Sequence, residues 1–203
     1  MSDLTRRDFL GKASLYGGSM SIALAASLPL TVEAAAKSQL PHTLTQTEWS
    51  SVEAMTQRII PSDDTPGAIE ANCVNFIDKA LAHEEQTALS MVQSSLATLG
   101  RHCQANWNKS FFKLSAAQQN SVLAALEDNQ LKVWPSDGAS SAQFFGFIRA
   151  LTIMGFLADP KYGGNSNYVG WQLAGYPGPR HHNGGYSAAQ MMGTEVVEPI
   201  WKL

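Results

Sequence analysis

The chain has 203 residues, of which 44% are apolar and 15% charged, so it is long enough for one domain with a single core and too apolar for a disordered protein. Its net charge at pH 7 is −3. The charged residues of both signs are interspersed, without the basic footprint of a nucleic-acid-binding protein, and no nucleic-acid partner is expected.

Residues 1–36 read as a targeting segment rather than as part of the domain. Its first half carries two adjacent arginines and two apolar residues, Arg6, Arg7, Phe9 and Leu10. A weakly apolar run follows, and small residues, Ala34 and Ala36 among them, end the segment. This arrangement resembles a twin-arginine export signal that is cleaved after Ala36. It implies recognition by the twin-arginine translocase and places residues 37–203 in the periplasm.

The remaining chain reads as a succession of helices, the first two of which have clear boundaries. Thr45 and Glu48 form a capping box for the first helix, whose apolar stripe stops at Pro61. A polar turn then offers a cap at position 64 or 65 and proline at the first position of a second helix, expected over residues 66–83.

Three further helices follow. Apolar residues recur at helical spacing from Leu89 to Cys103, where Gly100 is a candidate for an early end. Ser115 and Gln118 repeat the capping-box pattern for a fourth helix, and an apolar fifth helix over 144–157 is too short to span a bilayer. The sequence predicts a mostly α fold, a single helical domain of about five helices up to about residue 158, followed by a long Gly/aromatic-rich C-terminal loop region, 159–203.

Neither the cysteines nor the paired histidines indicate a site. In a helical hairpin that turns near Glu84, Cys73 lies about 16 Å before the turn and Cys103 about 28 Å after it. A disulfide needs Cα atoms within about 7 Å, so both cysteines are expected to be unpaired core residues unless Gly100 reverses the chain. His181 and His182 are adjacent, point to opposite sides of an extended chain, and favour a solvated turn over a metal site.

Sequence motifs for cofactor chemistry are missing. There is no glycine fingerprint for a dinucleotide, no P-loop, no haem-attachment cysteine pair, no HExxH and no nucleophile elbow. We therefore expect no catalytic, cofactor-binding or metal-binding residues in this chain. A catalytic triad scattered through the sequence stays open.

Four stretches, residues 59–81, 111–126, 144–165 and 162–178, together resemble the gluconate 2-dehydrogenase subunit 3 family. The resemblance covers residues 44–179. Its most specific part is the order of the DPxYGGN, GW and GYPG elements in one loop, namely Asp159, Pro160, Tyr162, Gly163, Gly164, Asn165, Gly170, Trp171, Gly175, Tyr176, Pro177 and Gly178.

The resemblance implies a small, non-catalytic subunit of a bacterial dehydrogenase that is associated with the inner membrane. Its implied partners are an FAD-containing large subunit of the glucose-methanol-choline oxidoreductase group and a multihaem cytochrome c subunit. FAD and haem c are then held by these partners, and the small subunit often carries the export signal for a flavoprotein that lacks one. The substrate, a sugar or a sugar acid, is not specified by the resemblance.

The loop itself is the candidate partner-binding site. Ordering its residues 162–178, glycines above all, costs about 20 kcal/mol of conformational entropy, whereas burial of its four aromatic rings returns about 10 kcal/mol. Backbone hydrogen bonds, packing on its own domain or a partner's surface must supply the rest, and aromatic residues favour an interface. The candidate partner-binding residues are Tyr162, Gly163, Gly164, Asn165, Tyr168, Trp171 and Tyr176.

Two other functional classes stay open. One is a free-standing periplasmic enzyme that uses the loop as its active site, with Asp159, His181 or His182 as acid or base. The other is a periplasmic interaction protein unrelated to any dehydrogenase. A neighbouring gene for a flavoprotein, and one for a cytochrome with haem-attachment motifs, would favour the dehydrogenase subunit over both.

Overall fold

A computed structural model describes residues 41–131, 134, 139–179 and 185–202, all within one compact unit, 38–203. The described part is mostly helical and contains no strand, which confirms the predicted fold class. The predicted export signal, including the cleavage residues Ala34 and Ala36, lies outside the described residues.

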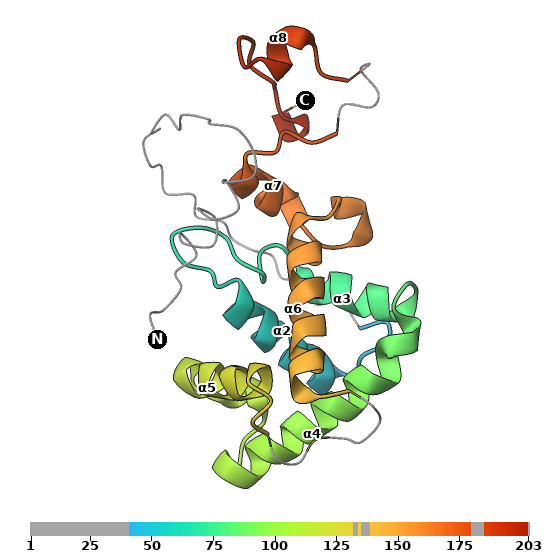
Figure 1. The fold of residues 1–203 in the computed structure, drawn as a ribbon, viewed down its shortest axis with the longest axis vertical. Helices are drawn as coiled ribbons and strands as arrows, with labels where there is room; N and C mark the ends of the chain where they lie inside the picture. The colour runs from blue at the N-terminus through green and yellow to red at the C-terminus, as the bar shows by residue number, and fades with distance from the viewer. Residues whose placement is uncertain (1–40, 132–133, 135–138, 180–184, 203) are drawn as a thin grey trace. The chain divides into compact units, whose positions relative to one another are not determined.

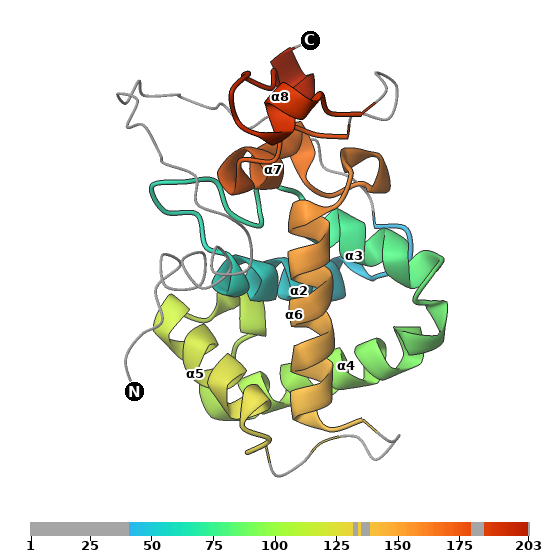
Figure 2. The same ribbon diagram turned by 45° about the horizontal axis from the view of Figure 1, so that its top comes forward.

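One long helix, α6, runs through the middle of the domain, with α2, α3, α4 and α5 around it and the short helices α7 and α8 beyond its C-terminal end (Figures 1 and 2). The helices are α2 (Gln46–Ile59), α3 (Cys73–Ala82), α4 (Leu89–Trp107), α5 (Ala116–Glu127), α6 (Ser141–Leu157), α7 (Val169–Ala174) and α8 (Ala188–Met191). None of the helices in the described ranges combines the length and apolar character needed to cross a bilayer.

Capping boxes begin three of the five longer helices, α2, α5 and α6. The two predicted boxes are confirmed: Thr45 caps α2 together with Glu48, and Ser115 caps α5 together with Gln118. A third box, which the sequence analysis did not identify, begins α6, where the Ser140 hydroxyl accepts from the Gln143 N–H at 3.2 Å.

The second helix begins later than predicted, at Cys73 instead of near Pro66. Two local features account for the difference. The Asp63 carboxylate accepts from the Thr65 N–H at 3.0 Å, which forms a tight turn in place of a helix cap. Asn72 has a left-handed backbone (φ 57°), so the helical hydrogen-bond ladder starts only after it.

The third helix extends one turn beyond its predicted apolar stripe, Leu89 to Cys103. Gly100 does not end α4, which continues to Trp107. The helix ends instead at Asn108, which takes the left-handed conformation (φ 53°) and donates its N–H to the Gln104 carbonyl at 3.0 Å.

The main core is apolar and lies around α6. α6 contacts α2, α3, α4 and α5 and supplies Phe144, Ile148 and Leu151, all at most 1% exposed. A second, smaller cluster lies near its C-terminal end, where Phe156 packs with Ala68, Ala71 and Cys73 and with apolar residues of α7. The described residues thus form a main apolar cluster around α6 and a smaller one at its C-terminal end.

A buried carboxylate fixes the first described residues to α3. Asp78 is fully buried and accepts from the N–H groups of His42 at 2.5 Å, Thr43 at 3.1 Å and Leu44 at 2.8 Å. Charge-assisted bonds of this kind are stronger than those between neutral groups. The chain that enters α2 is therefore held in place before the helix begins.

The two cysteines are unpaired, as the helix geometry predicts. Both are fully buried, and burial raises the pKa of the Cys73 thiol to about 12 and that of the Cys103 thiol to about 11. Because the thiolate is the reactive form, these thiols are inert packing residues at neutral pH.

Candidate functional site

The candidate site is the loop of residues 159–178, which follows α6 and turns back onto its C-terminal end. The sequence pattern predicts an irregular loop here. The loop instead consists of two 3₁₀ turns, Pro160–Tyr162 and Ser166–Tyr168, and the short helix α7. It contains no long apolar stripe that would have revealed these elements.

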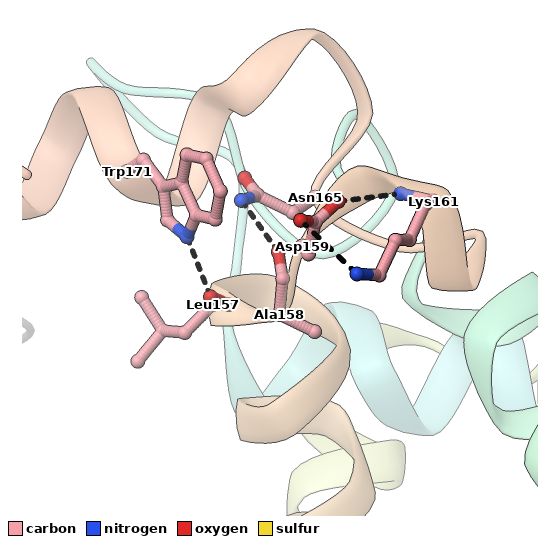
Figure 3. Close-up of polar contacts among 6 residues, drawn as sticks. All are labelled: Leu157, Ala158, Asp159, Lys161, Asn165 and Trp171. Atoms are coloured by element: carbon pink, nitrogen blue, oxygen red, sulfur yellow. Dashed lines mark hydrogen bonds and ion pairs between the residues drawn. The ribbon is translucent and has the colours of Figure 1, made fainter. Parts of the chain in front are cut away.

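Polar groups of the loop bond the last carbonyls of α6 (Figure 3). The Asn165 N–H donates to the Gly155 carbonyl at 2.7 Å, and the Asn165 side-chain amide donates to the Ala158 carbonyl at 2.8 Å. The Trp171 indole N–H donates to the Leu157 carbonyl at 2.6 Å. A helix leaves its last carbonyls without partners inside the helix, so the loop acts as a C-terminal cap for α6.

Asn165 is the central residue of this cap. Its side chain is fully buried. The carboxamide oxygen accepts from the Gly170 N–H at 2.8 Å, and the amide nitrogen donates to the Ala158 carbonyl at the end of α6. Its backbone is left-handed (φ 45°), a conformation that asparagine tolerates better than most residues. This one residue therefore ties the end of α6 to the start of α7.

Two glycines let the loop approach the α6 backbone. A Cβ atom on Gly164 would lie 2.2 Å from the Gly155 carbonyl oxygen, and one on Gly170 would lie 1.8 Å from the Phe156 carbonyl oxygen. Neither position has room for any side chain. These glycines are explained by close packing within the chain.

The loop is also tied to α3. The carbonyl of Gly163 accepts from the side-chain amide of Asn75 at 2.7 Å, and Asn75 is 3% exposed. Sequence reasoning missed Asn75, because 88 positions separate it from its partner and an asparagine on a helix carries no pattern of its own.

The aromatic residues of the loop differ in exposure. Trp171 is 6% exposed, and its ring contacts those of Tyr168 and Tyr176 at centroid distances of 5.6 Å and 5.0 Å. Tyr162 and Tyr176 are 52% and 41% exposed. The Lys161 ammonium lies 5.0 Å from the centroid of the Tyr162 ring. The loop thus holds one tryptophan inside and presents two tyrosines to solvent.

The seven candidate partner-binding residues therefore separate into two groups. Contacts within the chain account for Gly163, Gly164, Asn165 and Trp171. Tyr168 is half-buried, and Tyr162 and Tyr176 are exposed. Their role in binding a partner stays a prediction, and the two exposed tyrosines are the members of the set that a partner can reach in this structure.

Two charged or titratable groups of the loop have local partners. The Asp159 carboxylate accepts from the Lys161 N–H at 3.0 Å and lies 3.8 Å from the Lys161 ammonium (Figure 3). Desolvation is the main cause that raises the pKa of Tyr176 above its usual range. Electrostatic repulsion from the nearby Tyr186 and Asp159 raises this pKa further. Tyr176 is therefore a neutral phenol at physiological pH.

Within the described residues, no group of three or more His, Cys, Asp and Glu side chains could hold a metal ion. His181 and His182 lie outside the described residues, so the structure does not describe the histidine pair that the sequence analysis considered.

The family model described as gluconate 2-dehydrogenase subunit 3 matches residues 46–178, more than half of the chain. The match begins at the first residue of α2 and ends with the GYPG turn of the loop, and it confirms the resemblance found in the sequence. No curated protein and no solved structure matches the chain.

Proposed function

The chain belongs to the gluconate 2-dehydrogenase subunit 3 family, and from this premise we propose that it is the small, non-catalytic subunit of a periplasmic dehydrogenase at the inner membrane. It binds and stabilises an FAD-containing large subunit of the glucose-methanol-choline group. The twin-arginine signal of this chain carries the folded complex of both subunits across the membrane. A multihaem cytochrome c is the third subunit. FAD and haem c belong to the partners, and this chain holds no cofactor.

The observation that carries this proposal is the exposure of Tyr162 and Tyr176 on a loop whose backbone is fixed to α6. Tyrosine offers a large apolar ring with one polar end, and it is enriched in the energetically important part of protein interfaces. Met154 and Leu157, at the end of α6, add exposed apolar side chains at 47% and 45%.

The loop's internal bonds favour a binding role over an active-site role. Asn165 and Trp171 use their polar groups on the carbonyls of α6, so these groups do not face a substrate. A surface that is ordered before binding loses less conformational entropy when the partner arrives. The same bonds thus support recognition of a protein surface by the exposed tyrosines.

The test is recovery of the FAD-containing large subunit from the same organism, purified through a tag on the small subunit. Tyr162→Ala with Tyr176→Ala should weaken binding at least tenfold, because an anchor at an interface centre contributes about 2 kcal/mol or more. Helical content, followed by circular dichroism, should stay at the unmodified level because both side chains face solvent.

The matched control is Tyr162→Phe with Tyr176→Phe, which keeps both rings and should recover the flavoprotein at nearly the unmodified level. Full recovery of the flavoprotein by the double alanine variant would reject the loop as the binding surface. A flavin absorption band, or stoichiometric metal, in the purified small subunit alone would reject the assignment as a subunit without a cofactor.

Export in a complex has its own test. Arg6→Lys with Arg7→Lys keeps the net charge but removes the guanidinium groups, which lysine does not replace. We expect this variant to leave both the small subunit and the flavoprotein in the cytoplasm, with loss of dehydrogenase activity on the periplasmic side. If cell fractionation finds the flavoprotein in the periplasm at normal levels, the flavoprotein has its own route and the co-export role is wrong.

A further inference from the structure

The segment of residues 185–202, which we call the strap, folds back onto the loop and contacts one turn from both of its ends. The Tyr186 hydroxyl donates to the Gly178 carbonyl at 3.0 Å, and the Ile200 N–H donates to the Pro177 carbonyl at 2.9 Å. Pro177 and Gly178 belong to the GYPG element at the end of the family match, so the strap lies outside the matched region and is attached to its last residues.

The side chain of Ile200 packs directly on this turn. Gly178 has a left-handed backbone (φ 96°), and a Cβ atom there would lie 2.7 Å from Cδ1 and Cγ1 of Ile200. The absence of a side chain at Gly178 is therefore what lets the strap reach the turn.

The next residue, Trp201, extends the aromatic contacts of the loop. Its ring stacks on that of Tyr168 with centroids 5.6 Å apart and an interplanar angle of 29°. Tyr168 also contacts Trp171, and Trp171 contacts Tyr176 with the two rings nearly perpendicular. A continuous row of four rings thus connects the strap to an exposed tyrosine of the candidate site.

Tyr168 has a backbone conformation that needs such support. Its φ is 58°, in the left-handed region that large side chains rarely adopt. Strained residues of this kind persist where the surrounding structure holds them, and they concentrate at functional sites. The rings of Trp171 and Trp201 both contact Tyr168, one from inside the loop and one from the strap.

The middle of the strap makes no comparable use of its apolar residues. Met191 and Met192 are each 72% exposed and Val196 is 81% exposed. The anchoring residues and the exposed residues are therefore different, and substitutions can separate their effects.

We propose that Ile200 and Trp201 are positioning residues that lock the loop in its binding shape, with Tyr168 and the GYPG turn as the points at which they act. Locking keeps Tyr176 in place before the partner arrives. The identity of the partner, the flavoprotein, rests on the proposed function, whereas the lock is a property of this chain alone.

The lock is tested first without any partner, by hydrogen exchange of the full-length chain. In Ile200→Ala with Trp201→Ala, the loop amides of Tyr168 and Tyr176 should exchange about tenfold faster, because a lost aromatic stack changes a local opening equilibrium by that order. Amides of α3 and the middle of α6 should keep their rates. The single variant Trp201→Phe retains a stacking ring, so its loop amides should exchange as slowly as those of the unmodified chain. Unchanged exchange of the loop amides in the double alanine variant would overturn the proposal.

The second measurement is the dissociation constant of the flavoprotein. The double alanine variant should bind about tenfold more weakly and Trp201→Phe within about twofold of the unmodified chain. The matched control, Met191→Ser with Met192→Ser, should bind normally. Equal weakening by this control would overturn the lock, because the strap would then be a direct contact surface. If the unmodified chain does not bind the flavoprotein while the exchange result holds, the proposed function fails and the lock remains.

Discussion

The helical body, made of α2 to α6, and the loop, residues 159–178, are stabilised by different interactions. The body is stabilised by apolar side chains that meet around α6. The loop is stabilised by hydrogen bonds from Asn165 and Trp171 to the carbonyls at the end of α6. Its glycines Gly164 and Gly170 pack directly against the backbone of α6. A region of irregular structure can therefore be as defined as a helix bundle when it satisfies the polar groups that a helix leaves open.

The largest expected effect tests whether the two regions unfold together. Phe144 is fully buried in the main core, so Phe144→Ala should lower the free energy of unfolding by about 3–5 kcal/mol. Because α6 connects the core to the loop, urea unfolding followed by circular dichroism and by tryptophan fluorescence should give one shared transition. Two separate transitions would show that the loop is ordered independently of the body.

A substitution in the loop should be nearly as costly without touching the core. Gly170→Ala brings a methyl group against the Phe156 carbonyl oxygen, where a Cβ atom would lie at 1.8 Å, and should cost about 3 kcal/mol of unfolding free energy. Gly100→Ala is the control, since nothing lies within 4 Å of its Cβ position in α4. It should stabilise the protein by about 0.5–1 kcal/mol. Similar unfolding midpoints for both variants would contradict the close packing of the loop.

The cap on α6 has an intermediate expected effect. Asn165→Ala leaves the Ala158 carbonyl and the Gly170 N–H without their side-chain partners and should cost about 2 kcal/mol in thermal or urea unfolding. Asn167→Ala is a matched control, because Asn167 is exposed and has a similar left-handed backbone (φ 53°). The excess cost at Asn165 measures the buried hydrogen bonds. No excess would mean that these bonds contribute little.

The smallest effect is a pH dependence at the contact between the two regions. Cys73 lies in the cluster that α7 covers, and burial raises the pKa of its thiol from 9.0 to about 12. Between pH 9 and pH 12 the thiol ionises in the unfolded chain but stays protonated in the folded one, so rising pH favours the unfolded chain. The stability that this thiol contributes below pH 9 is therefore lost as the pH rises toward 12. Between pH 9 and 10 the unmodified protein should lose about 1 kcal/mol more than Cys73→Ala. Parallel losses of unfolding free energy in the two proteins would contradict the burial of this thiol.

Sequence reasoning predicted the body well and the loop only in part. Capping boxes and apolar stripes are local patterns, so the starts of α2 and α5 could be read directly. The start of α3 was predicted too early because the proline that could begin a helix directly follows a turn stabilised by Asp63, and no helix starts there. The loop was recognised from its letters, but Asn165 bonds backbone carbonyls of α6, and carbonyls leave no mark in a sequence. Composition also does not distinguish a buried tryptophan from an exposed tyrosine.

The carboxylate of Asp78 has a consequence for the order of events during synthesis. Its partners, the N–H groups of His42, Thr43 and Leu44, precede it by 36, 35 and 34 positions. A ribosome releases the N-terminal end first, at about 5–20 residues per second. The N–H groups of residues 42–44 therefore cannot bind the Asp78 carboxylate until α3 has left the ribosome. During that interval the predicted export signal is joined to a segment that the domain does not yet hold.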